Sequence, residues 1–80
     1  MKLVFTNRAK KDISKFPNEV IEQLKESITS LSQEPYQGIK LTGRWRGYRR
    51  LRSGNYRIIY RIQDSEIIVH YIRHRQSAYR

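Results

Sequence analysis

GYRRLRSGNYRIIYRI, residues 47–62, carries the clearest structural pattern of this chain. Its apolar and basic side chains alternate with a period of two on either side of a turn at residues 53–55, which predicts a β-hairpin. Before the turn, Tyr48, Arg50 and Arg52 lie on one predicted face and Arg49 and Leu51 on the other. After the turn, one face carries Tyr56, Ile58, Tyr60 and Ile62, and the other carries Arg57, Ile59 and Arg61. Adjacent cations repel across a sheet, so the basic face calls for an anionic partner.

The segments around this hairpin predict the remaining elements. Residues 2–5 form a short strand, and residues 7–16 form a helix capped by Thr6 or Asn7. Pro17 opens a second helix at its first position, over residues 18–33, with an apolar stripe of Ile21, Leu24, Ile28 and Leu31. Residues 67–75, after a turn at 63–66, form the third strand of a meander that begins with the hairpin. The predicted fold is α+β, in the order β-α-α-β-β-β.

A helical hairpin covers only one face of an antiparallel sheet, so the opposite face is expected to stay partly open. We place the arginines of the alternating strands on that open face. The chain of 80 residues carries no internal repeat and no linker, so residues 1–80 are predicted to form one domain. Cysteine is absent, which excludes disulfides and thiolate metal sites. No segment approaches the ~18 apolar residues of a membrane span, and a cytoplasmic protein is expected.

Positive charge is concentrated in the second half of the chain. Residues 1–39 hold six Lys or Arg against five Asp or Glu, whereas residues 40–80 hold eleven against two. Ten of those eleven cations are arginine, whose planar fork matches phosphate and stacks on bases. The bias therefore favours a phosphate-rich partner. A generic basic face, as on many ribosome-associated proteins, is the alternative, and an anionic membrane surface fits strands less well than it fits an amphipathic helix.

Familiar catalytic motifs are missing from the sequence. It has no phosphate-binding loop and no H-E-x-x-H, and Asp64 and Glu66 are the only acids of its basic half. A two-metal nuclease needs several carboxylates, so that mechanism is not expected. RNA can also be cleaved by its own 2′-hydroxyl, which requires a proton acceptor, a proton donor and cations at the phosphate. Candidate acceptors are Tyr79, His74 and His70, since arginine holds its proton at neutral pH.

Three motifs in order, KLTG (40–43), YRRLRSGNYRIIYRI (48–62) and IRHRQSAY (72–79), resemble the RelE/ParE toxin superfamily and specifically its RelE-like branch. The resemblance covers essentially the whole chain and implies the RelE-like fold with a basic concave face. It implies the toxin of a type II toxin–antitoxin system, a ribosome-dependent mRNA endonuclease that cuts mRNA in the A site. The implied reaction is metal-free 2′-hydroxyl attack, which leaves a 2′,3′-cyclic phosphate and a 5′-hydroxyl, without any cofactor.

The resemblance also implies roles for individual residues. Arg50 and Arg52 would bind the phosphate, and Arg57 would stabilise the transition state. Arg75 would assist the leaving oxygen as cation or proton donor, with Arg73 as the alternative. Tyr79 would act as base or as a stacking platform. The strand positions carry only arginine, so a lysine proton shuttle is unavailable here. The RNA-binding residues implied or inferred from charge are Lys40, Arg44, Arg46, Arg49, Arg73 and His74.

The implied partners are the ribosome with its mRNA and a cognate antitoxin, an acidic segment that folds as it wraps the basic toxin. The toxin–antitoxin complex would bind its own operator DNA, and no membrane is involved. Two other functions fit the same sequence. A ParE-like inhibitor of DNA gyrase uses this fold without cleaving RNA, and a non-catalytic basic RNA-binding module needs no reaction at all.

Overall fold

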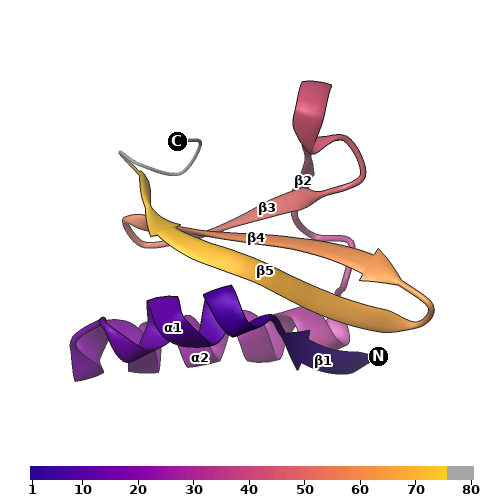
Figure 1. The fold of residues 1–80 in the computed structure, drawn as a ribbon. Helices are drawn as coiled ribbons and strands as arrows, with labels where there is room; N and C mark the ends of the chain where they lie inside the picture. The colour runs from indigo at the N-terminus through magenta and orange to yellow at the C-terminus, as the bar shows by residue number, and fades with distance from the viewer. Residues whose placement is uncertain (76–80) are drawn as a thin grey trace.

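The computed structural model describes residues 1–75, in which two helices lie against one face of a five-stranded sheet (Figure 1). In chain order the elements are β1 (Lys2–Phe5), α1 (Asn7–Ser14), α2 (Asn18–Gln33), β2 (Ile39–Lys40), the 3₁₀ turn η1 (Gly43–Trp45), β3 (Arg49–Ser53), β4 (Tyr56–Gln63) and β5 (Glu66–His74). The η1 turn rises on the side of the sheet opposite the helices. The predicted α+β class and the helical hairpin on one face are confirmed.

The sheet has the strand order β1-β5-β4-β3-β2 and is mixed rather than antiparallel throughout. Strands β2 to β5 pair antiparallel, as predicted, but β1 pairs parallel with β5, from Lys2 opposite Glu66 to Phe5 opposite Val69. The expectation of an entirely antiparallel sheet was therefore wrong at β1. The long connection between these two strands permits parallel pairing, which a short hairpin cannot make. The two-residue edge strand β2 was not predicted.

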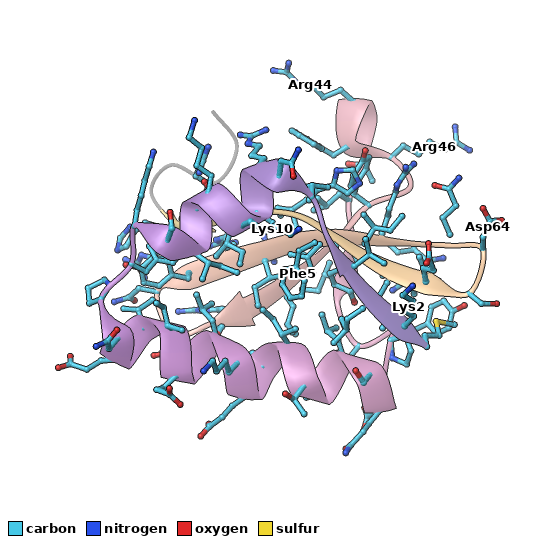
Figure 2. All side chains as sticks on the ribbon, turned by 60° about the horizontal axis from the view of Figure 1, so that its bottom comes forward. Lys2, Phe5, Lys10, Arg44, Arg46 and Asp64 are labelled. Atoms are coloured by element: carbon cyan, nitrogen blue, oxygen red, sulfur yellow. The ribbon has the colours of Figure 1, made fainter. Side chains whose placement is uncertain are left out.

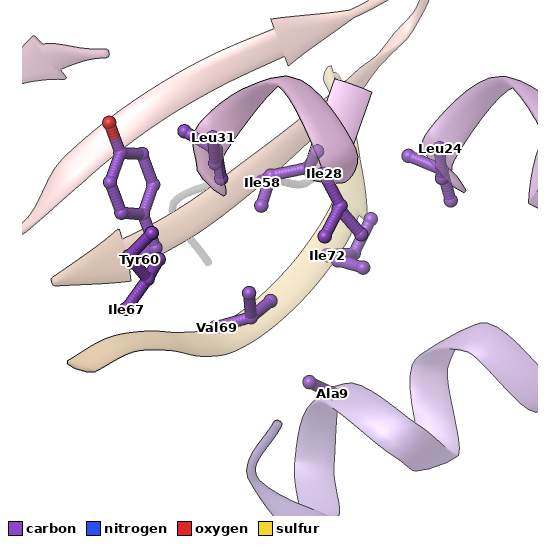
Figure 3. Packing of buried hydrophobic residues seen from close by; sticks show 9 residues of the cluster. All are labelled: Ala9, Leu24, Ile28, Leu31, Ile58, Tyr60, Ile67, Val69 and Ile72. Atoms are coloured by element: carbon purple, nitrogen blue, oxygen red, sulfur yellow. The ribbon is translucent and has the colours of Figure 1, made fainter. Parts of the chain in front are cut away.

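The alternation read from the sequence holds through β3 and β4. Leu51, Ile58 and Tyr60 face the helices, and Ile58 and Tyr60 are completely buried there. Leu24, Ile28 and Leu31 of α2 and Ala9 of α1 pack onto them from the other layer (Figure 3). Phe5 points into the same interior from the end of β1 (Figure 2). Because the apolar residues recur every three to four positions in α2 and every two in β4, both elements present one continuous apolar surface.

Both helix starts follow from local chemistry. Thr6 is the N-cap of α1: its Oγ1 accepts a hydrogen bond from the N–H of Ala9 at 3.1 Å. The same hydroxyl donates to the carbonyl of His70 at 2.7 Å, which ties the start of α1 to β5. Pro17 is the N-cap of α2 and lies one position before the first helical residue, rather than at the first helical position that was expected. Neither helix of the described part of the chain is long and apolar enough to cross a membrane.

Asp12 completes the edge of β5 that β1 leaves uncovered. Strand β1 ends opposite Val69, so the next part of β5 has no neighbouring strand on that side. Asp12 of α1 is buried there, and its Oδ2 accepts a hydrogen bond from the N–H of Ile72 at 3.0 Å. Its Oδ1 accepts from the guanidinium of Arg73. A helix carboxylate thus takes the place of the missing strand and satisfies a buried backbone donor.

A β-bulge in β5 sets the direction of its last side chains. Ile59 pairs with Tyr71 and Tyr60 pairs with Val69, so His70 is an extra residue with no partner in the ladder. Before the bulge Val69 faces the helices, and after it Ile72 does. A regular strand would have put Tyr71 and Arg73 on the helix side. The bulge instead turns both toward the open face and turns His74 toward the helices.

Candidate functional site

Arginines form a row across three strands on the open face of the sheet. Arg52 of β3 lies directly opposite Arg57 of β4, which in turn lies opposite Arg73 of β5. Directly opposed side chains have Cβ atoms about 4.5–5.5 Å apart, and like charges at that distance destabilise a sheet. Arg50 lies in the neighbouring row, opposite Ile59. The register thus concentrates positive charge on one surface, which bound anions would relieve.

Three side-chain nitrogens on this face are buried but, within residues 1–75, have no hydrogen-bond partner: Arg57 Nε, Arg61 Nε and His70 Nε2. A buried donor without a partner costs about 1–3 kcal/mol, and such groups are rare in folded proteins. Arg57 lies at the centre of the arginine row. A phosphate oxygen bound there would satisfy the Arg57 nitrogen and neutralise part of the surrounding charge.

Arg75 lies beside the turn that joins β3 to β4. Its backbone N–H donates to the carbonyl of Asn55 at 2.7 Å, and its side chain is exposed. Arg52 lies at the same turn, where its Nε donates to the carbonyl of Gly54 at 3.3 Å. The end of β5 is therefore held close to the arginine row. Tyr79, expected as base or as stacking platform, lies outside the described residues.

Two of the predicted RNA-binding arginines have partners within the protein. Arg49 faces the helix side, donates to the carbonyls of Tyr36 and Gly38 at 3.1 and 2.9 Å, and lies over the ring of Tyr36. Arg73 reaches from the open face to Asp12. His74 lies opposite Tyr56 on the helix side, with the two rings 5.4 Å apart, away from the arginine row.

The cations of the segment between β2 and β3 lie on the side of the molecule where η1 projects. Arg44 and Arg46 point outward from this segment (Figure 2). Next to it is a cavity of about 630 Å³ whose charged lining residues are Lys40, Arg46 and Arg49. Gly43 and Gly47 adopt φ values of 65° and 92°, which favour glycine and allow the tight path of the segment. These cations form a second basic area at the edge of the sheet where β2 and η1 lie.

Aromatic rings line the open face next to η1, and the sequence did not single them out as a site. Ring centroids are 5.4 Å apart for Trp45 and Tyr48, 5.5 Å for Trp45 and Tyr71, and 4.8 Å for Tyr48 and His70. Alternation placed Tyr48 on this face. Trp45 lies there because η1 projects from this side of the sheet, and Tyr71 because the β5 bulge turns its side chain to the open face. No local sequence pattern could have brought these two residues together.

The environment of His70 favours the neutral form of its ring. Its pKa is lowered first by burial, which disfavours the charged ring, and further by the positive charges of Arg61 and Arg8. A neutral imidazole has one donor and one acceptor nitrogen. His70 lies next to the aromatic rings rather than in the arginine row, so it is better placed to contact a ligand's polar edge than to serve a phosphate at Arg57.

A small domain with two helices on a mixed five-stranded sheet, and a basic open face, is the architecture of the RelE/ParE toxins. The sequence model of this group described as the ParE toxin of the type II toxin–antitoxin system parDE matches residues 3–79. The chain therefore belongs to the ParE toxin family, within the RelE/ParE superfamily, and is a toxin of a type II toxin–antitoxin system. No curated protein sequence matches it significantly.

Solved structures agree with this assignment. The chain is 31% identical to a chain of the toxin–antitoxin complex RelBE2 from Mycobacterium tuberculosis, over 92% of this chain and 96% of that one, with a TM-score of 0.85. It is 25% identical to a chain of the archaeal RelE–RelB complex from Pyrococcus horikoshii, over 96% and 97%, with a TM-score of 0.79. A chain of the chromosomal ParDE system from P. aeruginosa, 19% identical over 92% and 95% with a TM-score of 0.78, shares the fold.

Proposed function

We propose that this toxin is a ribosome-dependent endoribonuclease that cuts mRNA and so stops translation. The observation that carries the proposal is the row of Arg52, Arg57 and Arg73 across three strands, with the buried Nε of Arg57 lacking a partner among the described residues. Asp12 neutralises Arg73, but no ion pair within residues 1–75 neutralises the opposed Arg52 and Arg57. Their repulsion is costly in the free protein and becomes favourable binding energy when a phosphodiester lies on them. Guanidinium groups fixed before the reaction stabilise charge that develops on phosphorus oxygens.

The reaction is attack of the RNA 2′-hydroxyl on the adjacent phosphorus. The 2′-oxygen gives its proton to a base and bonds to phosphorus, while the bond to the 5′-oxygen breaks and that oxygen takes up a proton. A 2′,3′-cyclic phosphate and a 5′-hydroxyl result. We assign Arg50, Arg52 and Arg57 to the phosphate oxygens, Arg75 to the leaving oxygen and Tyr79 to the base. Arg75 rather than Arg73 takes this role because Arg73 is engaged by Asp12.

The ribosome is the second element of the proposal. Arg44 and Arg46 point outward from the segment between β2 and β3, and Lys40 lies at the exposed edge strand β2, where ribosomal RNA would meet them as the toxin enters the A site. This division of roles, with arginines of the sheet for the mRNA and cations of the η1 segment for the ribosome, requires a cytoplasmic protein. It needs no cofactor, because the substrate supplies the nucleophile.

We also propose a cognate antitoxin as partner, because the M. tuberculosis and P. horikoshii relatives are complexes of that kind. An acidic segment would cover the arginine face. A cavity of about 320 Å³ between α1, α2 and β1 would accept its apolar side chains. Lys25 and Thr29 also line this cavity, and its apolar lining residues are Phe5, Ile13, Ile21, Leu24 and Ile28. The pair would then bind its operator DNA.

Inhibition of DNA gyrase is a second candidate, favoured by the match to the ParE toxin family. Expression in cells, with ribosome-bound mRNA and chromosomal DNA analysed in parallel, separates the two. We expect arrested translation with cuts inside codons. DNA breaks with intact mRNA would establish the gyrase mechanism, and neither effect would leave only RNA binding.

Variants then test the residue roles. We expect Arg57→Gln and Arg75→Ala to abolish toxicity without unfolding the protein, and Tyr79→Phe to weaken cleavage more than ribosome binding. Lys10→Gln removes one exposed charge from α1 and serves as the control. Full toxicity of either arginine variant would reject its assignment.

A further inference from the structure

Beyond the arginine row, the open face carries a second group of residues that we call the Trp45 patch, made of Arg8, Trp45, Tyr48, Arg61, His70 and Tyr71. Guanidinium groups flank its rings: Arg8 lies 4.3 Å from the centroid of Tyr71, and Arg61 lies 5.8 Å from that of Tyr48. Tyr71 is buried, whereas Trp45 and Tyr48 are half-buried and so keep part of their rings at the surface. Surfaces that stack nucleobases combine aromatic rings with arginines in this way.

The patch also contains buried polar nitrogens that have no hydrogen-bond partner within residues 1–75. Of the three buried side-chain nitrogens without hydrogen bonds in residues 1–75, Arg61 Nε and His70 Nε2 lie in the Trp45 patch. A structural cluster that served only to hold η1 against the sheet would gain nothing from leaving these two atoms unsatisfied. A ligand with both an anionic group and a polar ring edge would satisfy the arginine and the imidazole together.

From this geometry we infer that the Trp45 patch is a second nucleotide-binding subsite, which stacks a base of single-stranded RNA on Trp45 and Tyr48 and holds its phosphate at Arg61. His70 contacts the polar edge of the base. The low pKa of His70 fits this role, because a neutral imidazole can donate to or accept from a base without bringing another charge.

The subsite lies on the same face as the arginine row and deepens the proposed function on which it rests. Arg57 and Arg61 are four residues apart on β4, roughly 13 Å at ~3.3 Å per strand residue. About four nucleotides at the ~3.4 Å spacing of a stacked strand cover that distance, and fewer if the strand is extended. The patch would therefore hold a nucleotide near the cleaved phosphate but not at it.

Trp45 is the only tryptophan of the chain, so its fluorescence reports directly on the patch. The purified protein is titrated with a 2′-O-methyl RNA hexamer, which cannot undergo 2′-hydroxyl attack, and with an abasic hexamer that carries the same number of phosphates. We expect the RNA to quench Trp45 and to bind about tenfold more tightly than the abasic strand, as one stacked base supplies. Equal affinities for the two hexamers, without quenching of Trp45, would overturn the proposal.

Variants of Tyr48 locate the effect. Tyr48→Leu should weaken RNA binding about tenfold and leave the abasic strand unaffected, whereas Tyr48→Phe should retain RNA binding. Tyr36→Leu, the same change at a tyrosine that is 61% exposed beside Arg49, is the matched control. A loss in Tyr48→Leu no greater than in Tyr36→Leu would reject the subsite.

Neither ribosomes nor cleavage enter this titration, so the two proposals fail separately. Base-dependent quenching by a protein that never cuts mRNA would retain the subsite and reject the nuclease. Cleavage on ribosomes by a protein that binds both hexamers equally would do the opposite.

Discussion

Replacing Asp12 by alanine tests how the end of β5 is held in place. Its carboxylate is buried, accepts from the N–H of Ile72, and pairs with Arg73, whose side chain is about one-third exposed. In Asp12→Ala the Ile72 donor loses its partner and Arg73 is left facing Arg57. A buried donor left without an acceptor lowers the free energy of unfolding by about 1–3 kcal/mol. Loss of the partly exposed ion pair, which solvent screens, lowers it by ~1 kcal/mol more.

Together these losses predict a decrease of about 3 kcal/mol in the free energy of unfolding. For a domain of this size each kcal/mol lowers the midpoint of thermal unfolding by about 4–8 °C, so the expected decrease is roughly 12–24 °C. Asp12→Asn keeps an oxygen that can accept from Ile72 and removes only the charge, so we expect it to cost about one-third as much. Thermal unfolding followed by circular dichroism measures all three proteins.

Asp64→Asn is the matched control. Asp64 is an exposed acid in the turn between β4 and β5 with a φ of 52°, a conformation that asparagine tolerates well, so this variant loses the same charge without losing a contact. If Asp12→Ala unfolds within 3 °C of Asp64→Asn, the carboxylate does not hold β5, and the argument for Arg75 over Arg73 loses its basis.

Three further outcomes follow from the same contacts. Because the pKa of His70 is lowered in the folded protein, the folded state binds fewer protons than the unfolded one as pH falls below ~6.5. Unfolding titrations should show stability fully present above that pH and lost as pH falls through the folded pKa, and a pH profile of His70→Gln as steep as that of the natural protein would contradict this. The hydroxyl of Tyr60 donates to the carbonyl of Pro35 and accepts from the N–H of Gly38, so Tyr60→Phe should lower the free energy of unfolding in urea by about 1–3 kcal/mol. Burial raises the pKa of Tyr60, so the stability of the natural protein should decline above pH ~10 and be lost as pH rises through the folded pKa. Binding of the 2′-O-methyl RNA should fall with added salt at a log–log slope of about −3 for four arginine–phosphate contacts, and a flat dependence would refute the phosphate contacts.

Most of the secondary structure and the faces of the strands could be predicted from the sequence, because the patterns that indicate them involve only neighbouring residues. A period of two in residues 48–62 and a period of 3.6 in residues 18–33 each require only a few neighbouring residues to be seen. The same alternation put Arg50, Arg52 and Arg57 on one face, and the register of β3 and β4 agrees. Thr6 was one of two expected caps and is the one used. The ordered motifs were sufficient to indicate the superfamily.

Long-range contacts decided what alternation could not. Parallel pairing of β1 with β5 joins residues more than sixty positions apart. The single extra residue at His70 reverses the sides of everything after it in β5, which sends Arg73 to the open face and His74 to the helices. A bulge has no signature in the alternation of this strand. In the folded protein it places Ile72 in the core, where Asp12 of a distant helix accepts from its N–H. The sequence determined which residues are basic and apolar, and only the assembled sheet determined which of them face the same space.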